Sequence, residues 1–530
     1  MIGRISMVSA IGSLAVQVVC GQNVKGRAEQ ENGENQKRPN ILFILSDDHT
    51  AQAWGVYGGI LSQYARNENI RRLAREGCVL ENSFCTNSIS VPSRAAILTG
   101  QYSHQNGVYT LADALSPDSA NVVKTIRESG YQTALFGKWH LKQEPSGFDH
   151  YAVFHDQGEY RNPVFKTADN WIDDDKGNNG RRAMGFSTDL VTDSTINWIK
   201  NCDRSKPFLM FCHFKATHEP WDYPERFANL FDGIEIPEPE NMMEFFPSPS
   251  GRSFKGQTLE TIGRNWEYAS EAPDKWWCQY PGLPFSTQGM DSISARKKIY
   301  QKFIKDYLRC GAAIDDNIGK LLSFLDQEGL SRNTVVIYVS DQGFFLGEHG
   351  FYDKRIMYEE SMRMPFVIRF PQEIPCGTRN RDIIQNTDFA ALLADYAHAK
   401  VPSGSIGQSF RSNLKGKTPK GWRQYAYYRY WTHHEIRPAH MGIRSDQYKL
   451  IFFYGHPLNT KGSSANPTIP MWEFYDLKKD PHENHNVYHQ PRYQKVIDEM
   501  KRELLEQRKL CGDVDGNNPV MEHIMQQYYW

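Results

Sequence analysis

Short apolar runs and segments with helical spacing alternate along this chain between about residues 38 and 343. The apolar runs predict buried parallel strands, which are hydrophobic on both faces. They cover residues 40–48, 133–138, 207–214 and 333–343. The segments between them have apolar residues every three to four positions, which predicts helices at 68–77, 188–201 (opened by a Thr or Asp cap) and 294–328. This alternation predicts a mostly parallel sheet covered by helices.

Two later regions depart from this pattern. Residues 232–293 are rich in Pro, Ser, Gly and Trp with weak periodicity, and we interpret them as a surface insertion at a substrate rim. After about residue 415, apolar segments with polar turns predict antiparallel strands, and residues 490–510 predict a closing helix. We therefore expect an α/β domain at 38–415 and a smaller C-terminal subdomain at 416–530.

The N-terminus predicts export. Arg4 precedes an apolar run at residues 7–19, which is too short to span a bilayer. Cleavage near residues 20–22 is favoured over lipidation of Cys20, because Val19 is bulky where a lipoprotein signal has a small residue. We expect a signal peptide at 1–21, a disordered lead-in at 22–37 and a periplasmic location. No other segment approaches the length and apolarity of a membrane span.

Composition narrows the class of function. The 530 residues include 61 Lys+Arg and 62 Asp+Glu, which gives a net charge of −1 with histidines neutral. A nucleic-acid-binding protein normally carries a basic excess, so this balance argues against one. Aromatic residues make up 13% of the chain. That share suits a carbohydrate-facing cleft, and a core rich in large rings explains it equally well.

Two of the predicted strands end in pairs of oxygen-bearing side chains, Asp47-Asp48 and Asp341-Gln342. Ligands of open α/β sheets bind outside the carboxyl ends of the strands. If the two strands are neighbours, three carboxylates and one amide oxygen meet there. Carboxylates at short range repel one another and need a cation, and oxygen ligands suit calcium or magnesium. Taken alone, each pair is more simply explained as loop or cap residues.

The segment from Ser90 to Gly100 is SVPSRAAILTG. It resembles the signature of the sulfatase family, in which Cys or Ser, one residue, Pro, one residue and Arg precede an apolar stretch ending in Thr-Gly. In that family the first residue is oxidised to formylglycine, and the serine resembles bacterial serine-type enzymes. A serine nucleophile would leave a stable sulfate ester, whereas a hydrated aldehyde offers one hydroxyl to attack sulfur and another to expel sulfate. Locally, a helix N-terminus also explains the segment and would help hold an anion.

Three more motifs follow in the family's order. They are GKWHL at 137–141, HFKATHEP at 213–220 and SDQGFFLGEHGFYDKR at 340–355. Alone, each Lys or His in them is more simply structural. Together they extend the resemblance over residues 38–510. It implies the alkaline-phosphatase-like sulfatase fold, a large mixed and mostly parallel sheet covered by helices, with a smaller C-terminal antiparallel sheet and a helix.

The resemblance also implies a ligand set for one calcium ion. The ligands would be Asp47, Asp48, Asp341, Gln342 and the modified Ser90. Gln342 departs from the asparagine that is commoner at its position, but it offers the same amide oxygen on a longer arm.

The same resemblance implies catalytic roles. Arg94 and Lys138 would hold the formylglycine hydrate, and Lys138, His218 and Lys354 would contact sulfate oxygens. Either His218 or Lys354 would protonate the departing alcohol oxygen. His140 would accept the proton of the second hydroxyl as sulfate leaves.

The substrate is suggested by a narrower similarity, to bacterial sulfatases of the N-acetylglucosamine-6-sulfatase group. It is carried by Asp353-Lys354-Arg355 and by residues 306–322, 440–451 and 473–483. The implied substrate is the 6-O-sulfate of glucosamine units in heparin, heparan or mucin-like glycans. Asp353 and Arg355 would read sugar hydroxyls, with a local ion pair as the alternative. His440 is a further substrate-binding candidate, with a structural role as its alternative.

Three other functions stay open at this point. A sulfatase could act on 2-O-, 3-O- or 4-O-sulfated sugars instead. A phosphatase or phosphonate hydrolase of the same superfamily would share the sheet and acid pairs, with an unmodified Ser or Thr and two transition metals. A catalytically silent glycan-binding protein would keep the scaffold. The partners implied by the main interpretation are a sulfated glycan and an enzyme that matures Ser90.

Overall fold

The structure is a computed structural model that describes residues 38–530 except 66, 173–178, 249–250 and 252–254. The expected signal peptide, Cys20 and the lead-in therefore lie outside the described residues. Within the described part, no helix combines the length and the apolarity needed to cross a membrane.

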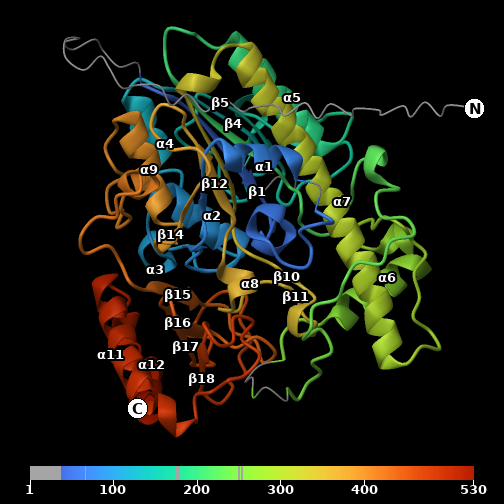
Figure 1. Cartoon of the computed structure of the whole chain (residues 1–530), viewed down its shortest axis with the longest axis vertical. Helices are drawn as coiled ribbons and strands as arrows, with labels where there is room; N and C mark the ends of the chain where they lie inside the picture. The colour runs from blue at the N-terminus through green and yellow to red at the C-terminus, as the bar shows by residue number, and fades with distance from the viewer. Residues whose placement is uncertain (1–37, 66, 173–178, 249–250, 252–254) are drawn as a thin grey trace, which may run out of the picture. The chain divides into compact units, whose positions relative to one another are not determined.

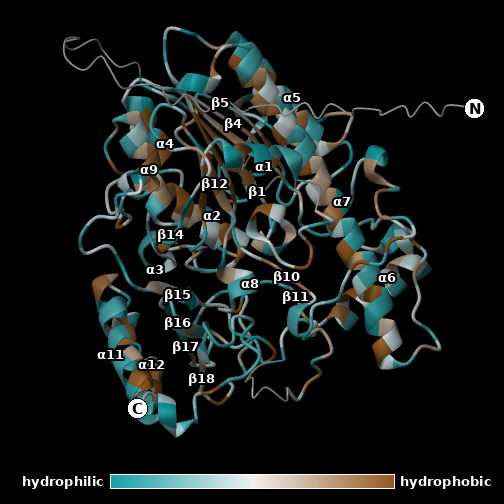
Figure 2. Cartoon of the chain, in the orientation of Figure 1, coloured by the Kyte–Doolittle hydropathy of each residue, from teal (hydrophilic) through white to brown (hydrophobic). Residues whose placement is uncertain are grey.

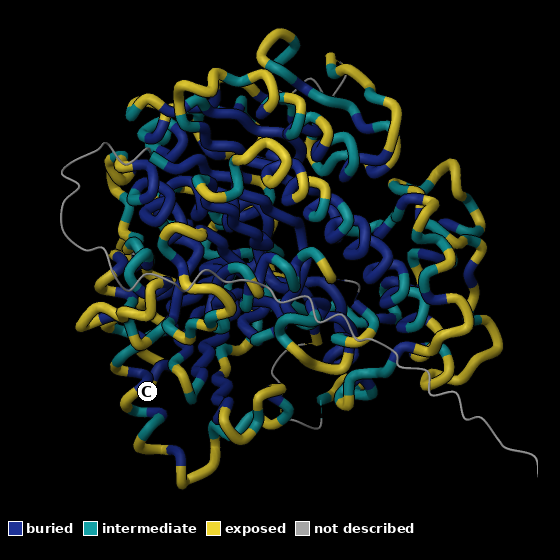
Figure 3. Tube along the Cα trace, turned by 45° about the horizontal axis from the view of Figure 1, so that its top comes forward, coloured by how far each residue is buried: buried dark blue, intermediate teal, exposed yellow. Residues whose placement is uncertain are grey.

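The motif-bearing strands lie together at the centre of a ten-stranded sheet. In spatial order they are β9 (Thr334–Ser340), β1 (Asn40–Ser46), β8 (Phe208–His213) and β4 (Gln132–Gly137). All three neighbouring pairs are parallel. The strands are buried almost throughout, as their apolar runs predict, and Figure 3 shows the buried residues concentrated in this part of the molecule.

Strands of both directions extend the sheet on either side. Next to β9 lie β12 (Phe366–Arg369), β2 (Cys78–Leu80) and β13 (Thr378–Asn380), and β12 is antiparallel to both of its neighbours. Next to β4 lie the parallel β5 (His150–Phe154) and the antiparallel β6 (Val164–Lys166) and β7 (Arg181–Arg182). The predicted mixed, mostly parallel sheet is confirmed.

Helices cover both faces of the sheet (Figure 1). Alternate side chains of β1 show this, because successive residues of a strand point to opposite faces. Ile41, Phe43 and Leu45 pack in one apolar cluster, and Leu42 and Ile44 in another. The first cluster contains α2 (Ser90–Thr99), α4 (Val122–Glu128) and α9 (Asp388–Ala397), and the second contains α1 (Glu68–Arg75), α5 (Ser187–Asn201) and α7 (Ser292–Gln327). Figure 2 shows hydrophilic residues along α1, whereas all ten residues of α2 are buried.

The C-terminal part forms the predicted antiparallel sheet. Its strands are β15 (Ala426–Tyr430), β16 (His440–Arg444), β17 (Tyr448–Phe453) and β18 (Met471–Asp476). The predicted closing helix is α11 (Gln494–Leu510), which packs on this sheet through Ile497, Met500 and Leu504. The domain boundary at 415/416 stays a prediction.

Several short elements lie between these. They are β3 (Ser83–Phe84) paired with β14 (Ile384–Gln385), the hairpin of β10 (Phe345–Leu346) and β11 (Tyr352–Asp353), and the helices α3 (Ser103–Asn106), α8 (Glu359–Met362) and α10 (Arg411–Leu414).

Three local predictions differ from the structure. The N-cap of α5 is Phe186, with no side-chain cap, so the expected Thr or Asp cap is wrong. The insertion contains the amphipathic helix α6 (Leu259–Glu271), whose Trp266 is buried in the cluster of α7. A further helix, α12 (Pro519–Tyr528), follows α11.

Gly137, at the end of β4, has a conformation and a contact that both require glycine. Its φ is +99°, and a Cβ there would lie 1.9 Å from the carbonyl oxygen of His213. We expect Gly137→Ala to lower the free energy of unfolding by more than the roughly 1–2 kcal/mol of left-handed strain alone. Gly130→Ala is the matched control, because its φ is +95° but the nearest atom to its added Cβ is 3.5 Å away. If denaturant unfolding shows that the two variants lose equal free energy of unfolding, the clash at residue 137 is contradicted.

Candidate active site

Strand pairing brings the two acid pairs together. Ser46 of β1 pairs with Ser340 of β9, so Asp47-Asp48 and Asp341-Gln342 leave neighbouring strands at the same level. On the other side of β1 lie β8, which leads to His218, and then β4, which leads to Lys138. The condition on which the sequence argument depended, that the two acid-bearing strands are neighbours, is therefore met.

The three aspartates form a buried cluster. Asp47, Asp48 and Asp341 each place one carboxylate oxygen within 4.8 Å of the others, and this is the only such group of His, Cys, Asp or Glu within the described residues. Gln342 Nε2 donates to Asp48 Oδ1 at 2.5 Å, while Gln342 Oε1 is buried without a hydrogen-bond partner among the described residues. A buried amide oxygen without a partner, next to three carboxylates, fits a cation that prefers oxygen ligands.

Helix α2 places Ser90 and Arg94 on this cluster. Ser90 is the first residue of the helix, is 1% exposed and donates from Oγ to Asp47 Oδ1 at 3.0 Å. Arg94, one turn later, donates from Nε to Asp341 Oδ2 at 2.9 Å and from Nη1 to the Lys138 carbonyl at 2.9 Å. The helix N-terminus adds a partial positive charge at Ser90. An anion at position 90 would therefore be stabilised by the helix as well as by Arg94.

Two buried lysines contact the same carboxylates. Lys138 Nζ contacts Asp47 Oδ2 and donates to Gln157 Oε1 at 2.6 Å. Lys354, directly after β11, donates from Nζ to both oxygens of Asp48, at 2.7 and 2.5 Å. Burial, and next the charge of Lys215, hold the pKa of Lys138 well below its usual value.

The charges of this cluster balance without a metal ion. At their formal charges, three aspartates face three basic side chains, Arg94, Lys138 and Lys354. A divalent cation would leave two positive charges in excess. A sulfate ester and an ionised nucleophile carry about one negative charge each, so together they would restore the balance.

His140 is buried and His218 is half-buried, and the surroundings of both rings favour the neutral imidazole. His218 Nδ1 lies 2.9 Å from the Glu219 carbonyl and so carries the proton, while Nε2 lies 3.9 Å from Asp48 Oδ2. His140 Nε2 lies 3.5 Å from an oxygen of Asp156, and its Nδ1 is buried without a partner among the described residues. Burial, and next the charge of Lys138, hold the pKa of both imidazoles well below its usual value. Both rings are therefore unprotonated at neutral pH, and each has one nitrogen lone pair.

Asp353 and Arg355 lie on either side of Lys354 and form an ion pair with each other. Arg355 Nε donates to Asp353 Oδ2 at 2.6 Å. Arg437 Nη1 donates to the same oxygen at 3.2 Å, and Arg355 Nη1 donates to the Tyr430 hydroxyl at 3.4 Å. Arg437 could not be predicted from the sequence, because the loop between β15 and β16 carries no motif. One carboxylate and two guanidinium groups thus lie beside the lysine that contacts Asp48.

Both ring nitrogens of His440 contact the protein backbone. Its Nε2 accepts from the Met357 N–H at 3.1 Å, and its Nδ1 lies 2.8 Å from the Pro438 carbonyl. The ring is 2% exposed and packs against Tyr428 and Phe453. A direct hydrogen bond to substrate would require one of these backbone contacts to break. Through the hydrogen bond from the Met357 N–H, His440 instead holds the backbone two residues after Arg355.

Two further polar residues near the cluster were missed. Gln157 accepts from Lys138 as described above, and it lies in a loop without a motif. Lys215 is buried, with Nζ 3.3 Å from the Gln157 carbonyl and 3.4 Å from the Glu219 carbonyl. Burial lowers the pKa of Lys215 to about 8. Lys215 could have been predicted as a site residue, because it lies three residues before His218 inside the motif at residues 213–220.

Comparison with known families agrees with this geometry. A family model described as Sulfatase matches residues 39–399. A second model, described as the C-terminal part of N-sulphoglucosamine sulphohydrolase, matches residues 347–510. The chain therefore belongs to the sulfatase family and is a sulfuric ester hydrolase.

Individual relatives match along nearly the whole chain. An N-acetylglucosamine-6-O-sulfatase of Bacteroides thetaiotaomicron is 38% identical over 520 residues, which cover 91% of this chain and 88% of that protein. A solved structure of BT4656 in complex with its substrate D-glucosamine-2-N,6-O-disulfate matches with a TM-score of 0.80 and 36% identity, over 91% of this chain and 100% of that one. An arylsulfatase of Clostridium perfringens is 24% identical over 517 residues, or 91% of this chain and 97% of that protein. The predicted fold class is confirmed.

Proposed function

We propose that this sulfatase removes the 6-O-sulfate from N-acetylglucosamine or glucosamine units of glycosaminoglycan or mucin-type glycans. The observation that carries the proposal is the 38% identity, over most of both chains, to the N-acetylglucosamine-6-O-sulfatase of Bacteroides thetaiotaomicron. The ion pair of Asp353 and Arg355 supports it, because it offers groups that bind sugar hydroxyls on both sides of Lys354. Export to the periplasm belongs to the same proposal, with lipidation of Cys20 as its alternative.

The proposal includes one calcium ion and the oxidation of Ser90 to formylglycine by a maturing enzyme. Asp47, Asp48, Asp341 and Gln342 would hold the ion together with the modified residue 90, and the partnerless Oε1 of Gln342 supports this ligand set. When bound, calcium would act as a Lewis acid toward a sulfate oxygen. The hydrated aldehyde would supply one hydroxyl for attack and a second for release of sulfate.

The side chains of the protein would then divide the remaining tasks. Arg94 and Lys138 would orient and stabilise the ionised group at position 90, and Lys138, His218 and Lys354 would contact the sulfate oxygens. We favour Lys354 over His218 as the proton donor to the departing oxygen, because burial keeps His218 neutral and its one proton is bound by the Glu219 carbonyl. His140 would accept a proton as sulfate is released, which its neutral state allows.

Sulfate release from positional isomers tests the substrate. We expect kcat/KM for N-acetylglucosamine 6-sulfate to exceed that for the 3-sulfate, and for 2-O- and 4-O-sulfated sugars, by about a hundredfold or more, since a site built to bind specific hydroxyls rejects a sugar that cannot satisfy them. Released sulfate would be measured by ion chromatography. The 6-phosphate of the same sugar is the control for phosphatase activity. Preference for another sulfate position would refute the proposal.

A further inference from the structure

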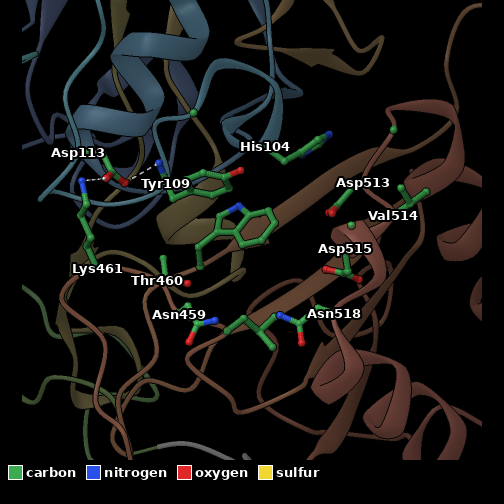
Figure 4. Close-up of a pocket in the computed structure, with 15 residues that line it drawn as sticks. His104, Tyr109, Asp113, Asn459, Thr460, Lys461, Asp513, Val514, Asp515 and Asn518 are labelled. Atoms are coloured by element: carbon green, nitrogen blue, oxygen red, sulfur yellow. Dashed lines mark hydrogen bonds and ion pairs between the residues drawn. The ribbon is translucent and has the colours of Figure 1, made fainter.

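We propose that Lys215 is a positioning residue that acts, through its neighbours, on two side chains expected to contact sulfate, Lys138 and His218. The inference rests on the proposed function and adds a residue to the same site. Lys215 is 3% exposed, and its ammonium group forms no ion pair with a carboxylate of the described residues. Figure 4 shows the opposite case, in which the exposed Lys461 lies 3.2 Å from an oxygen of Asp113. Because burying a charge is costly unless hydrogen bonds compensate it, Lys215 holds the atoms that it contacts.

Lys215 bridges two loops at the carboxyl edge of the central sheet. It lies just after β8, and β4 lies between β8 and β5 in the sheet. Its Nζ donates to the carbonyl of Gln157, in the loop after β5, at 3.3 Å, and to the carbonyl of Glu219, in its own loop, at 3.4 Å. The strand between them, β4, is the one that leads to Lys138. The ammonium group therefore joins the loops on both sides of the strand from which Lys138 leaves.

The first of these contacts leads to Lys138. Gln157 accepts from Lys215 at its backbone oxygen and from Lys138 Nζ at its side-chain oxygen, Oε1, at 2.6 Å. Apart from Asp47, Gln157 is the only hydrogen-bond partner of Lys138 Nζ among the described residues. A shift of the loop that carries Gln157 would therefore move the acceptor that orients this ammonium group.

The second contact leads to His218. The Glu219 carbonyl accepts both from Lys215 and from His218 Nδ1, which lies 2.9 Å away. Tyr160 completes the group, because its hydroxyl donates to the His218 carbonyl at 2.7 Å and its ring centre lies 5.1 Å from Lys215 Nζ. The three neighbours of the Lys215 ammonium group thus each contact Lys138 or His218 as well.

The charge of Lys215 explains why its partners are carbonyls and not an acid. After burial, this charge is the next cause that lowers the pKa of Lys138. Two buried ammonium groups repel each other, and an anion placed at Lys138 relieves the repulsion. A carboxylate paired with Lys215 would cancel its charge, whereas backbone carbonyls leave that charge available to attract the sulfate group.

Lys215→Met tests the positioning role, because methionine is about as long as lysine and lacks the ammonium group. With N-acetylglucosamine 6-sulfate and matured enzyme, we expect kcat to fall about tenfold and KM to rise less, because Lys138 also stabilises the ionised group at position 90, which forms only during the reaction. The matched control is Lys501→Met. Lys501 is also 3% exposed, donates to the Tyr529 carbonyl at 2.6 Å and lies 4.4 Å from the ring centre of Trp472. It should keep wild-type kinetics.

A double-mutant cycle separates positioning from a loss of folded protein. Gln157→Leu removes the side-chain oxygen that accepts from Lys138 and keeps the backbone carbonyl that accepts from Lys215. If Lys215 acts through that side-chain oxygen, Lys215→Met should cost about threefold or less in the Gln157→Leu background, against about tenfold by itself. A purely structural loss would be the same factor in both backgrounds. Melting temperatures of all variants establish that each is folded.

Each outcome decides the inference. A fall in kcat for Lys215→Met that becomes smaller in the Gln157→Leu background supports it. No fall, or equal factors in the two backgrounds, overturns it. If the wild type releases no sulfate from N-acetylglucosamine 6-sulfate, the proposed function fails, and the same cycle on the sulfated sugar that the wild type does desulfate decides the role of Lys215. If Lys215→Met does not fold, Lys215→Gln, which keeps a donor for the two carbonyls, replaces it in the cycle with the same criterion.

Discussion

Replacement of Ser90 by alanine is expected to lower sulfate release by at least about a thousandfold, since the loss of a nucleophile removes the main reaction path. Ser90 opens α2, and among the described residues it is the hydroxyl that donates to Asp47. Alanine fits the same helix position, and the fold should survive. Sulfate release from N-acetylglucosamine 6-sulfate is the measurement. Ser129→Ala, which removes a hydroxyl that donates to the Ile126 carbonyl, is the matched control.

The same experiment can separate the role of the modification from that of the serine. Protein made in a host without a maturing enzyme should keep the wild-type fold and lack activity. Peptide mass spectrometry across residues 82–94 should show a loss of about 2 Da in the active protein, because oxidation of serine to an aldehyde removes two hydrogens. Full activity with an unmodified Ser90 would contradict the formylglycine mechanism and leave the fold assignment intact.

The central sheet and its acid pairs were predictable because ligands of open α/β sheets bind outside the carboxyl ends of the strands. Buried parallel strands are apolar on both faces, so β1 and β9 are visible as runs, and the polar residue that ends each run marks the binding edge. Periodicity alone did not establish that the two strands pair. The order of the family's motifs supplied that information, and the pairing of Ser46 with Ser340 confirms it.

Residues that reach the site from irregular segments were not predictable in the same way. Arg437 and Gln157 lie in loops, where no period relates sequence position to direction in space. The environment of His440 depends on the path of residues 355–358 beside β16, a tertiary contact that its own sequence does not encode. Helix α6 was missed for another reason. Its apolar spacing is regular but short, and the Pro- and Ser-rich residues around it obscured the period.

Removal of divalent cations is expected to lower activity by about a hundredfold or more, and added calcium should restore it. The contacts of the two lysines supply the reason. Lys354 donates to both oxygens of Asp48, and Lys138 contacts Asp47. While those carboxylates hold the lysines, the lysines are poorly available to sulfate. A cation that takes over the carboxylates would therefore both polarise the ester and release two ammonium groups toward it. Magnesium should restore less, because it is smaller and keeps its water ligands.

Stability gives an independent measure of the same site. Calcium at a hundred times its dissociation constant should stabilise the protein by about 2.7 kcal/mol if the unfolded chain does not bind it. Asp341→Ala should abolish this calcium-dependent rise in melting temperature. Asp315→Asn, at a buried carboxylate that accepts from the Ile70 N–H at 2.9 Å outside the cluster, should keep it. Undiminished activity after chelation would contradict the calcium site, and two bound zinc ions per chain would favour a phosphatase-type centre.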